Sequence, residues 1–196
     1  MTKKLMVGSV PVGGGTPVTI QSMCNTKTDQ VDATVAQIHA LEAAGCEIIR
    51  IAVPDEAAAM AVDRIKEQIT IPLIADIHFN YKLAIMCAER GIDALRINPG
   101  NIGGEERVKA VAEACRRKRI PIRIGVNGGS LEKSLRAKYG GVTAEALVES
   151  AMGHVKLLNR YDFDDICVSL KSSDVRTTMA AYRLMSERCD YPLHLG

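Results

Sequence analysis

The sequence predicts an α/β protein of the TIM-type (β/α)8 barrel class, truncated after about seven strands. Short apolar segments alternate with segments of helical periodicity along almost all of the 196 residues. The apolar segments carry few polar residues on either side, which is typical of parallel strands covered by helices. A doubly wound open sheet is the competing fold, but the first strand-to-helix turn lacks a G-x-G-x-x-G motif. We therefore expect a barrel.

The first elements can be justified one by one. Residues 1–16 are rich in glycine and proline, so we expect a lead-in loop or hairpin there, followed by an incomplete barrel over residues 17–196. The first strand is expected at 17–23. A helix at 32–44 follows, because Val35, Ile38 and Leu41 recur at helical spacing before a glycine. The same criteria predict strands at 48–53, 73–76 and 94–97, with helices at 56–68 and 81–90.

The later elements continue this alternation. The helix at 105–117 begins with Glu105 and Glu106, where the helix dipole favours negative charge. A longer insertion separates the strand at 122–126 from the helix at 144–159. The remaining elements are a strand at 166–170, a helix at 175–188 and one more strand that begins at Leu193.

Composition excludes several classes of protein. The net charge is +2, with no tryptophan and two phenylalanines, so a nucleic-acid-binding surface is not expected. No apolar run approaches the length of a membrane span, and no signal-peptide core follows the first residues. No two cysteines form a C-x-x-C pair, which argues against a zinc knuckle or a disulfide scaffold. We expect a reduced, cytoplasmic protein with no metal site among its six cysteines: Cys24, Cys46, Cys87, Cys115, Cys167 and Cys189.

One turn has the character of an anion-binding loop. Arg96 lies near the end of the strand at 94–97, and Pro99-Gly100 then forces a turn towards the next helix. Free backbone N–H groups at a helix amino terminus, beside a strand-end cation, suit a phosphate. We therefore assign Gly100, Asn101 and Gly103 to an anion-binding turn. The alternative is an ordinary strand-to-helix turn whose arginine meets a neighbouring carboxylate.

Polar side chains recur where the predicted strands end, which is where barrels of this class carry their chemistry. Where one strand carries two such residues, they lie two or four residues apart and so share a face of the strand. The residues between them are mostly apolar and should face the helices: Ile77, Ile97, Ile124, Val126 and Leu170. The polar set comprises Gln21, Arg50, Asp76, His78, Arg96, Asn98, Arg123, Asn127, Ser169, Lys171 and His194.

Four cations in one barrel mouth would repel each other strongly unless an anion lay among them. The planar fork of arginine suits phosphate oxygens, so a diphosphate is the natural ligand. Structural alternatives remain for single residues. Arg50 could pair with Asp76, His78 could be a core histidine, and Lys171 could extend along the surface.

Seven collinear segments resemble 4-hydroxy-3-methylbut-2-enyl diphosphate synthase, a family of the non-mevalonate isoprenoid pathway. The most specific is Arg-Ile-Asn-Pro-Gly-Asn-Ile-Gly, at 96–103. The matching segments are 18–23, 49–54, 72–79, 95–103, 120–133, 169–174 and 192–196.

The resemblance implies a reductive ring opening of 2-C-methyl-D-erythritol 2,4-cyclodiphosphate, with electrons from ferredoxin or flavodoxin passing through a [4Fe–4S] cluster. It implies diphosphate binding by Arg50, Arg96, Asn98, Arg123, Asn127 and Lys171, with His78 and Ser169 nearby. The cluster of the family lies in a carboxyl-terminal domain that caps the barrel of the partner in a homodimer. That domain and the last barrel strand have no counterpart here, so we expect the amino-terminal part of such an enzyme, without cluster ligands.

Three other interpretations remain open from the residues alone. A class I aldolase-type barrel would use Lys171 to form a Schiff base with a phosphosugar. A barrel of the pterin-synthase type is possible by analogy of fold. A non-catalytic diphosphate-binding subunit would use the same cations without turnover.

Overall fold

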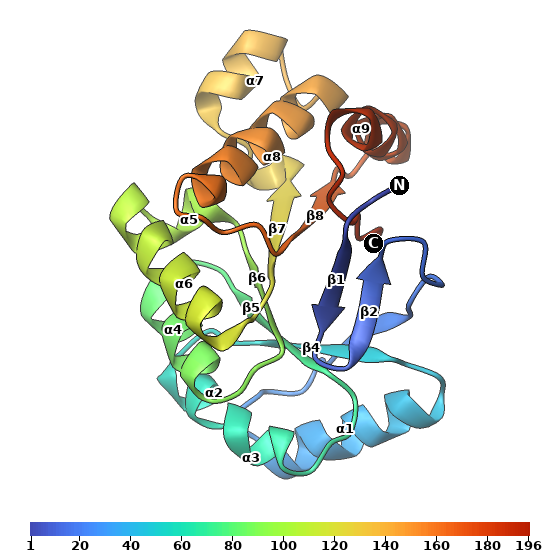
Figure 1. The fold of residues 1–196 in the computed structure, drawn as a ribbon, viewed down its shortest axis with the longest axis vertical. Helices are drawn as coiled ribbons and strands as arrows, with labels where there is room; N and C mark the ends of the chain where they lie inside the picture. The colour runs from blue at the N-terminus through green and yellow to red at the C-terminus, as the bar shows by residue number, and fades with distance from the viewer.

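The computed structural model describes all 196 residues and shows a parallel sheet curled into most of a barrel (Figure 1). The six strands lie side by side in the order of the sequence, and every neighbouring pair is parallel. They are β3 (Gln21–Met23), β4 (Ile48–Ala52), β5 (Leu73–Ile77), β6 (Ala94–Ile97), β7 (Ile122–Asn127) and β8 (Ile166–Lys171). The predicted barrel class is confirmed.

The helices form an outer layer around this sheet. Successive helices contact each other from α2 to α4, α6, α8 and α9, and Figure 1 shows them following the curve of the strands. No helix is both long and apolar enough to cross a lipid bilayer. The covering helices are α1 (Val31–Ala43), α2 (Glu56–Met60), α3 (Val62–Lys66), α4 (Tyr81–Glu89), α6 (Glu105–Lys118), α8 (Ala144–Asn159) and α9 (Val175–Arg188).

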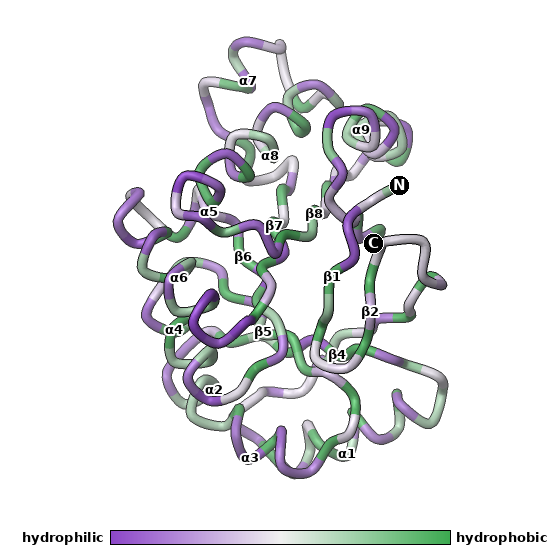
Figure 2. The backbone as a smooth tube through the Cα atoms, viewed as in Figure 1, coloured by the Kyte–Doolittle hydropathy of each residue, from purple (hydrophilic) through white to green (hydrophobic).

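The main core lies between the outer face of the sheet and these helices. Alternate strand residues such as Ile49, Ile77 and Ile97 are fully buried there. All five residues expected to face the helices belong to this core. Figure 2 shows the result, with hydrophobic strands inside and hydrophilic turns on the outer helices. The other strand face therefore points into the barrel.

A hairpin closes the amino-terminal end of the barrel. It consists of β1 (Lys4–Val7) and β2 (Val10–Gly13), which pair antiparallel. Val7 packs with Ile48, Ile74 and Ala94, the inward residues at the starts of three strands, and Val10 and Val12 pack against this group. We call these six residues the floor. It covers the interior of the barrel at the end opposite the carboxyl ends of the strands.

Two predicted strands are shorter than expected. Of the strand at 17–23, only β3 forms, because β4 begins at Ile48 and leaves earlier residues without a neighbour. Val18 is accordingly 96% exposed. The strand expected from Leu193 is a single parallel bridge to Val168.

One helical prediction needs correction, and one segment without a prediction proves to be helical. The helix expected at 56–68 is two helices, because the N–H of Ala61 bonds to the carbonyl of Ala58, three residues back, and tightens the turn. The insertion after β7 contains the short helix η1 (Gly128–Ser130) and α7 (Lys133–Tyr139). No residue of α7 is fully buried, and only Leu135 and Tyr139 pack partly against the core, so its apolar pattern is too short to predict a helix.

Candidate functional site

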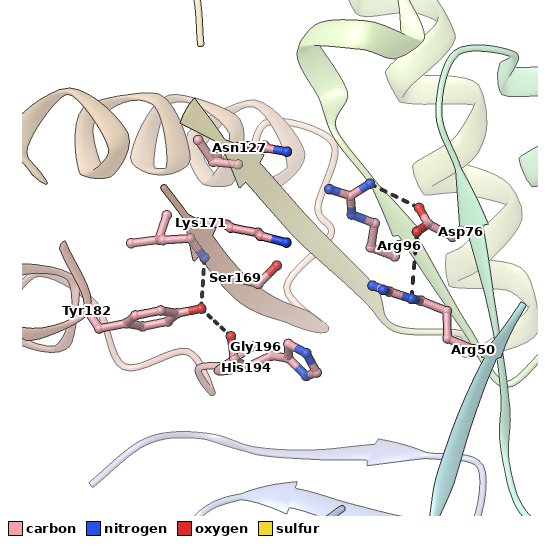
Figure 3. A pocket seen from close by; sticks show the side chains of 11 residues that line it. Arg50, Asp76, Arg96, Asn127, Ser169, Lys171, Tyr182, His194 and Gly196 are labelled. Carbon is pink, nitrogen blue, oxygen red and sulfur yellow. Dashed lines mark hydrogen bonds and ion pairs between the residues drawn. The ribbon is translucent and has the colours of Figure 1, made fainter. Parts of the chain in front are cut away.

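The carboxyl ends of the strands surround a polar cavity of about 200 Å³ (Figure 3). We call this cavity the mouth. Val126, Leu170, Tyr182 and Gly196 complete its lining. Seven of its residues belong to the polar strand-end set that the sequence predicts: Arg50, Asp76, Arg96, Asn127, Ser169, Lys171 and His194.

Strand register explains why these side chains meet. Asp76 on β5 lies opposite Arg96 on β6, and Asn127 on β7 lies opposite Lys171 on β8. Residues at matched positions of neighbouring parallel strands point to the same face. A period of two in the sequence thus becomes a ring of polar groups around one opening.

A single carboxylate in the mouth faces two guanidinium groups. Asp76 Oδ1 lies 3.0 Å from Arg96 Nη1, and Asp76 Oδ2 lies 3.7 Å from Arg50 Nε. Asp76 is 4% exposed, so these ion pairs are screened little by water. Burial lowers the pKa of Arg50, Asp76 opposes that shift, and repulsion from Arg96 adds to it. The predicted pairing of Arg50 with Asp76 therefore exists, but one carboxylate serves both arginines.

Lys171 adds a further positive charge from the other side of the mouth. Figure 3 shows its amino group beside Ser169 and Asn127, directed towards the arginines across the cavity. Lys171 has no acidic side chain within ion-pair distance, since none of the ion pairs of the chain includes it. The mouth thus presents three side-chain cations to one carboxylate.

Arg123 lies deeper in the barrel than the mouth. It is 4% exposed, and its Nη1 donates to Gln21 Oε1 over 3.3 Å. Its Nε and Nη2 are buried without a partner in the protein. Burial, followed by repulsion from Arg50, lowers the pKa of Arg123 to about 10. An uncompensated guanidinium of this kind is expensive to bury, and an anion would offset the cost.

Arg123 and Gln21 line a second cavity, of about 670 Å³, between the mouth and the floor. Arg50, His194 and Gly196 border both cavities. The two cavities therefore adjoin, one at the carboxyl ends of the strands and the other reaching Arg123. Four cations border this space, which is large enough for a small polyanion.

His194 is held at the mouth by backbone contacts. Its N–H donates to the carbonyl of Val168 over 2.9 Å. The hydroxyl of Tyr182, from α9, donates to the His194 carbonyl and accepts from the N–H of Leu170 at 3.0 Å. Burial, with repulsion from Arg123 and Arg50, lowers the pKa of the imidazole to about 4. His194 is therefore neutral at pH 7.

Gly125, which was not predicted from the sequence, determines the position of Arg96. A Cβ atom at Gly125 would lie 2.3 Å from Arg96 Nε, so the guanidinium crosses directly over this glycine. Gly125 alternates with Arg123 and Asn127 on β7, and that spacing could have identified it as an inward position. Tyr182 was also missed, since a tyrosine on an amphipathic helix reads as an ordinary core residue.

Four residues of the polar strand-end set lie outside the lining of the mouth. Gln21 and Arg123 line the second cavity, and His78 and Asn98 line neither. His78 is exposed on the loop after β5, where its ring stacks loosely on Phe79. Asn98 is buried and caps α5 (Pro99–Ile102), with its Oδ1 accepting from Gly100 N at 3.1 Å. The N–H of Asn101 bonds to the Asn98 carbonyl. Two N–H groups expected to be free for an anion are thus used inside the turn.

Gly103 has φ +117° and joins α5 to α6, which accounts for a glycine at this position. The part of Gly100, Asn101 and Gly103 in anion binding stays a prediction.

The residues of this chain do not fit a [4Fe–4S] cluster. No three His, Cys, Asp or Glu side chains come together as a metal site. All six cysteines are free, and burial raises the pKa of Cys24 and Cys167 to about 11 and of Cys87 and Cys115 to about 12. Cluster ligation requires thiolates, which these environments disfavour.

Comparison with known proteins gives a family match over nearly the whole chain. Residues 2–196 match the model described as the GcpE TIM-barrel domain. Proteins named 4-hydroxy-3-methylbut-2-en-1-yl diphosphate synthase (flavodoxin) are 60% identical in Geobacter sulfurreducens and 54% identical in Ruminiclostridium cellulolyticum, each over 195 residues. These alignments cover 100% of this chain and 55% of each relative. The chain thus spans about half the length of the curated relatives it matches.

Solved structures with the same fold are distant in sequence. Dihydropteroate synthase of Yersinia pestis superposes with a TM-score of 0.67 at 12% identity, covering 98% of this chain and 75% of that one. For 3-dehydroquinate dehydratase of Geobacillus kaustophilus the TM-score is 0.72 at 13% identity, covering 100% and 80%. At this identity the likeness shows the barrel fold alone. The family match extends over the strands that build the mouth, and the chain belongs to the GcpE TIM-barrel domain family.

Proposed function

We propose that this chain is the substrate-binding barrel of a 4-hydroxy-3-methylbut-2-enyl diphosphate synthase. The enzyme would reductively open 2-C-methyl-D-erythritol 2,4-cyclodiphosphate to 4-hydroxy-3-methylbut-2-enyl diphosphate. The observation that carries the proposal is the charge imbalance of the interior. Arg50, Arg96, Arg123 and Lys171 border it, and Asp76 is their one carboxylate.

Each group has a proposed role that its geometry supports. The guanidinium groups of Arg50 and Arg96 are pre-oriented by Asp76, and so present fixed donors to phosphate oxygens. Lys171 approaches from the opposite wall as a mobile point charge. Arg123 supplies two unused donors at the bottom of the space. A cyclic diphosphate carries its negative charge on one compact face, which matches this converging arrangement.

Neutral and polar groups complete the proposed site. The amide of Asn127 and the hydroxyl of Ser169 lie beside Lys171, where they can bond to oxygens of the substrate. His194, neutral at pH 7, can donate or accept one hydrogen bond. The ligand would thus contact polar groups on both walls of the mouth, and arginine side chains would balance most of the phosphate charge.

The reduction itself requires partners beyond these residues. The resemblance implies a [4Fe–4S] cluster as the source of electrons, and the cysteines of this chain do not fit it. We propose that the cluster is held elsewhere in the working enzyme, a cytoplasmic homodimer. Flavodoxin is the donor of choice because the names of the relatives specify it, and ferredoxin is the alternative.

Isothermal titration of the chain tests the binding role directly. The cyclodiphosphate and inorganic pyrophosphate should both bind, the cyclodiphosphate more tightly, and a monophosphate should bind at least tenfold more weakly. Affinity should fall steeply with salt, because the attraction is between charges. Equal affinity for all three anions, or none, would contradict the proposal.

A further inference from the structure

A second polar cluster lies behind the mouth and takes no part in the function proposed above. His154 and Ser150 are buried on one face of α8, four residues apart. Glu132 reaches them from the loop after η1, where its Oε1 accepts from Ser150 Oγ at 3.0 Å and lies 3.2 Å from His154 Nε2. His154 Nε2 and the other carboxylate oxygen of Glu132 are both buried without a well-oriented hydrogen-bond partner. The Glu132 side chain is 36% exposed, whereas His154 is buried, and a buried histidine beside a carboxylate is a candidate for a functional role.

The imidazole of His154 also presses against the turn after β6. A Cβ atom at Gly100 would lie 3.3 Å from His154 Cε1 and 3.3 Å from Asn98 Oδ1. The Cε1–Nε2 edge of the ring therefore lies close to both Glu132 and Gly100. A side chain on a helix, outside the barrel mouth, thereby touches the turn that carries Asn98.

The two turns on either side of His154 are linked to the mouth. Asn98 Nδ2 lies 3.5 Å from Ser130 Oγ, which in turn donates to the carbonyl of Asn127 over 3.3 Å. Asn127 lines the mouth next to Lys171, its register partner on β8. Movement of the turn after β6 would therefore move the wall of the mouth that holds Asn127.

We propose that Glu132 and His154 are positioning residues, which clamp the turns 98–103 and 127–131 against α8 and so fix one wall of the anion site. The expected effect on anion binding rests on the proposed function, whereas the clamp itself does not. Desolvation lowers the pKa of His154, against the opposing effect of Glu132, so burial favours a neutral ring beside the carboxylate.

The first test is pyrophosphate binding by variants of the pair. His154→Leu and Glu132→Leu should each weaken binding 5- to 20-fold, and the double variant should be no worse than either single one, because the pair acts as a unit. His154→Gln keeps an N–H donor and should stay within threefold of the unmodified chain. His39→Leu is the matched control, because His39 lies 3.8 Å from Glu42 on α1, and its binding should not change. Unchanged binding in both leucine variants would overturn the proposal, as would a Gln variant as weak as the Leu one.

The second test concerns the contact between His154 and Gly100. Gly100→Ala should weaken binding in the unmodified chain, because the new methyl group displaces the ring or the Asn98 amide. In a His154→Ala background the same methyl should cost at most half as much on the logarithmic scale. Gly104→Ala is the steric control, since a Cβ there meets nothing within 4 Å. Strictly additive effects of Gly100→Ala and His154→Ala would contradict the clamp.

A third measurement does not depend on any ligand. Amide hydrogen exchange in 98–103 and 127–131 should be at least tenfold faster in His154→Leu than in His154→Gln, while exchange in β1 and β2 stays the same. If the unmodified chain fails to bind pyrophosphate but this difference appears, the proposed function fails and the clamp stands. If exchange in both segments is unchanged, the clamp is wrong whatever binds.

Discussion

The two ends of the barrel use the same strands for opposite purposes. At the end that the floor closes, every lysine of these ion pairs has at least one carboxylate: Lys66 pairs with Asp93, and Lys3 pairs with Asp164 at 2.7 Å and with Asp190 at 3.8 Å. The rest of that end is apolar and packed under the hairpin. At the mouth, by contrast, Asp76 is outnumbered by cations. The difference teaches that matched charge marks the end built for stability, and unmatched charge marks the end built for a ligand.

Removing apolar volume from the floor should give the largest effect of all, and on stability alone. Ile74→Ala should lower the free energy of unfolding by about 2–5 kcal/mol, because Ile74 is buried beneath the hairpin and leaves a cavity. Pyrophosphate affinity, measured well below Tm, should change less than twofold. Chemical denaturation and titration check the two halves. Met6→Ala, on the exposed face of β1, is the control and should cost less than about 1 kcal/mol. A large loss of affinity in Ile74→Ala would mean that the two ends are not independent.

Removing a cation from the mouth should lower the affinity for the ligand and leave stability almost unchanged. Arg96→Ala should weaken cyclodiphosphate binding by about 2–4 kcal/mol, as expected when a desolvated charge pair is broken. Arg96→Lys should recover only part of this, because the planar fork is lost. Stability should fall little, since Asp76 retains Arg50 as a partner. Isothermal titration decides the point, and unchanged affinity in Arg96→Ala would remove β6 from the site.

Gly125→Ala should reproduce part of the Arg96 effect without touching a charge. The added Cβ would lie 2.3 Å from Arg96 Nε and force the guanidinium aside, so we expect affinity to fall by about 1–3 kcal/mol. Gly153→Ala is the matched control. A Cβ at Gly153 meets nothing within 4 Å, and on a helix it should stabilise the chain by about 1 kcal/mol without affecting binding. If Gly125→Ala binds normally, the path of Arg96 over β7 does not matter for the ligand.

The smallest expected effect is a pH dependence from His194. Its pKa of about 4 in the folded chain lies below the ordinary 6.5, so the unfolded chain binds a proton that the folded chain refuses. Stability contributed by this group is full above about pH 6.5 and is lost as pH falls towards 4, by roughly 1–2 kcal/mol after allowance for its partial exposure. Denaturation curves between pH 4 and 7 should show this slope, and His194→Asn should flatten it.

The same histidine reports on the ligand. A bound pyrophosphate adds negative charge beside His194 and should raise its pKa above about 4, which NMR titration of the ring protons can follow. A pKa that does not respond to pyrophosphate would place the anion away from the wall of the mouth that His194 forms.

The alternation of strands and helices followed from the sequence because it rests on local rules. Buried parallel strands such as 48–52 are apolar on both faces, and helices such as 144–159 have one apolar side. Each element can therefore be recognised from its own residues. The period of two likewise identified which strand residues face inward, and seven of the eleven predicted strand-end residues line one cavity. The short helix α7 was not predicted, because none of its residues is fully buried and a weakly buried face leaves little apolar pattern in the sequence.

Contacts between distant segments were decided only by the tertiary structure. That Asp76 serves two arginines, that Arg123 lies below the mouth, and that Arg96 needs a glycine on the next strand all depend on register and depth in the barrel. The same holds for the contact of His154 with Gly100. A sequence repeat of two residues fixes which face a side chain occupies. How far it reaches across that face depends on the curvature of the sheet and on the size of its neighbours, and those are properties of the folded chain.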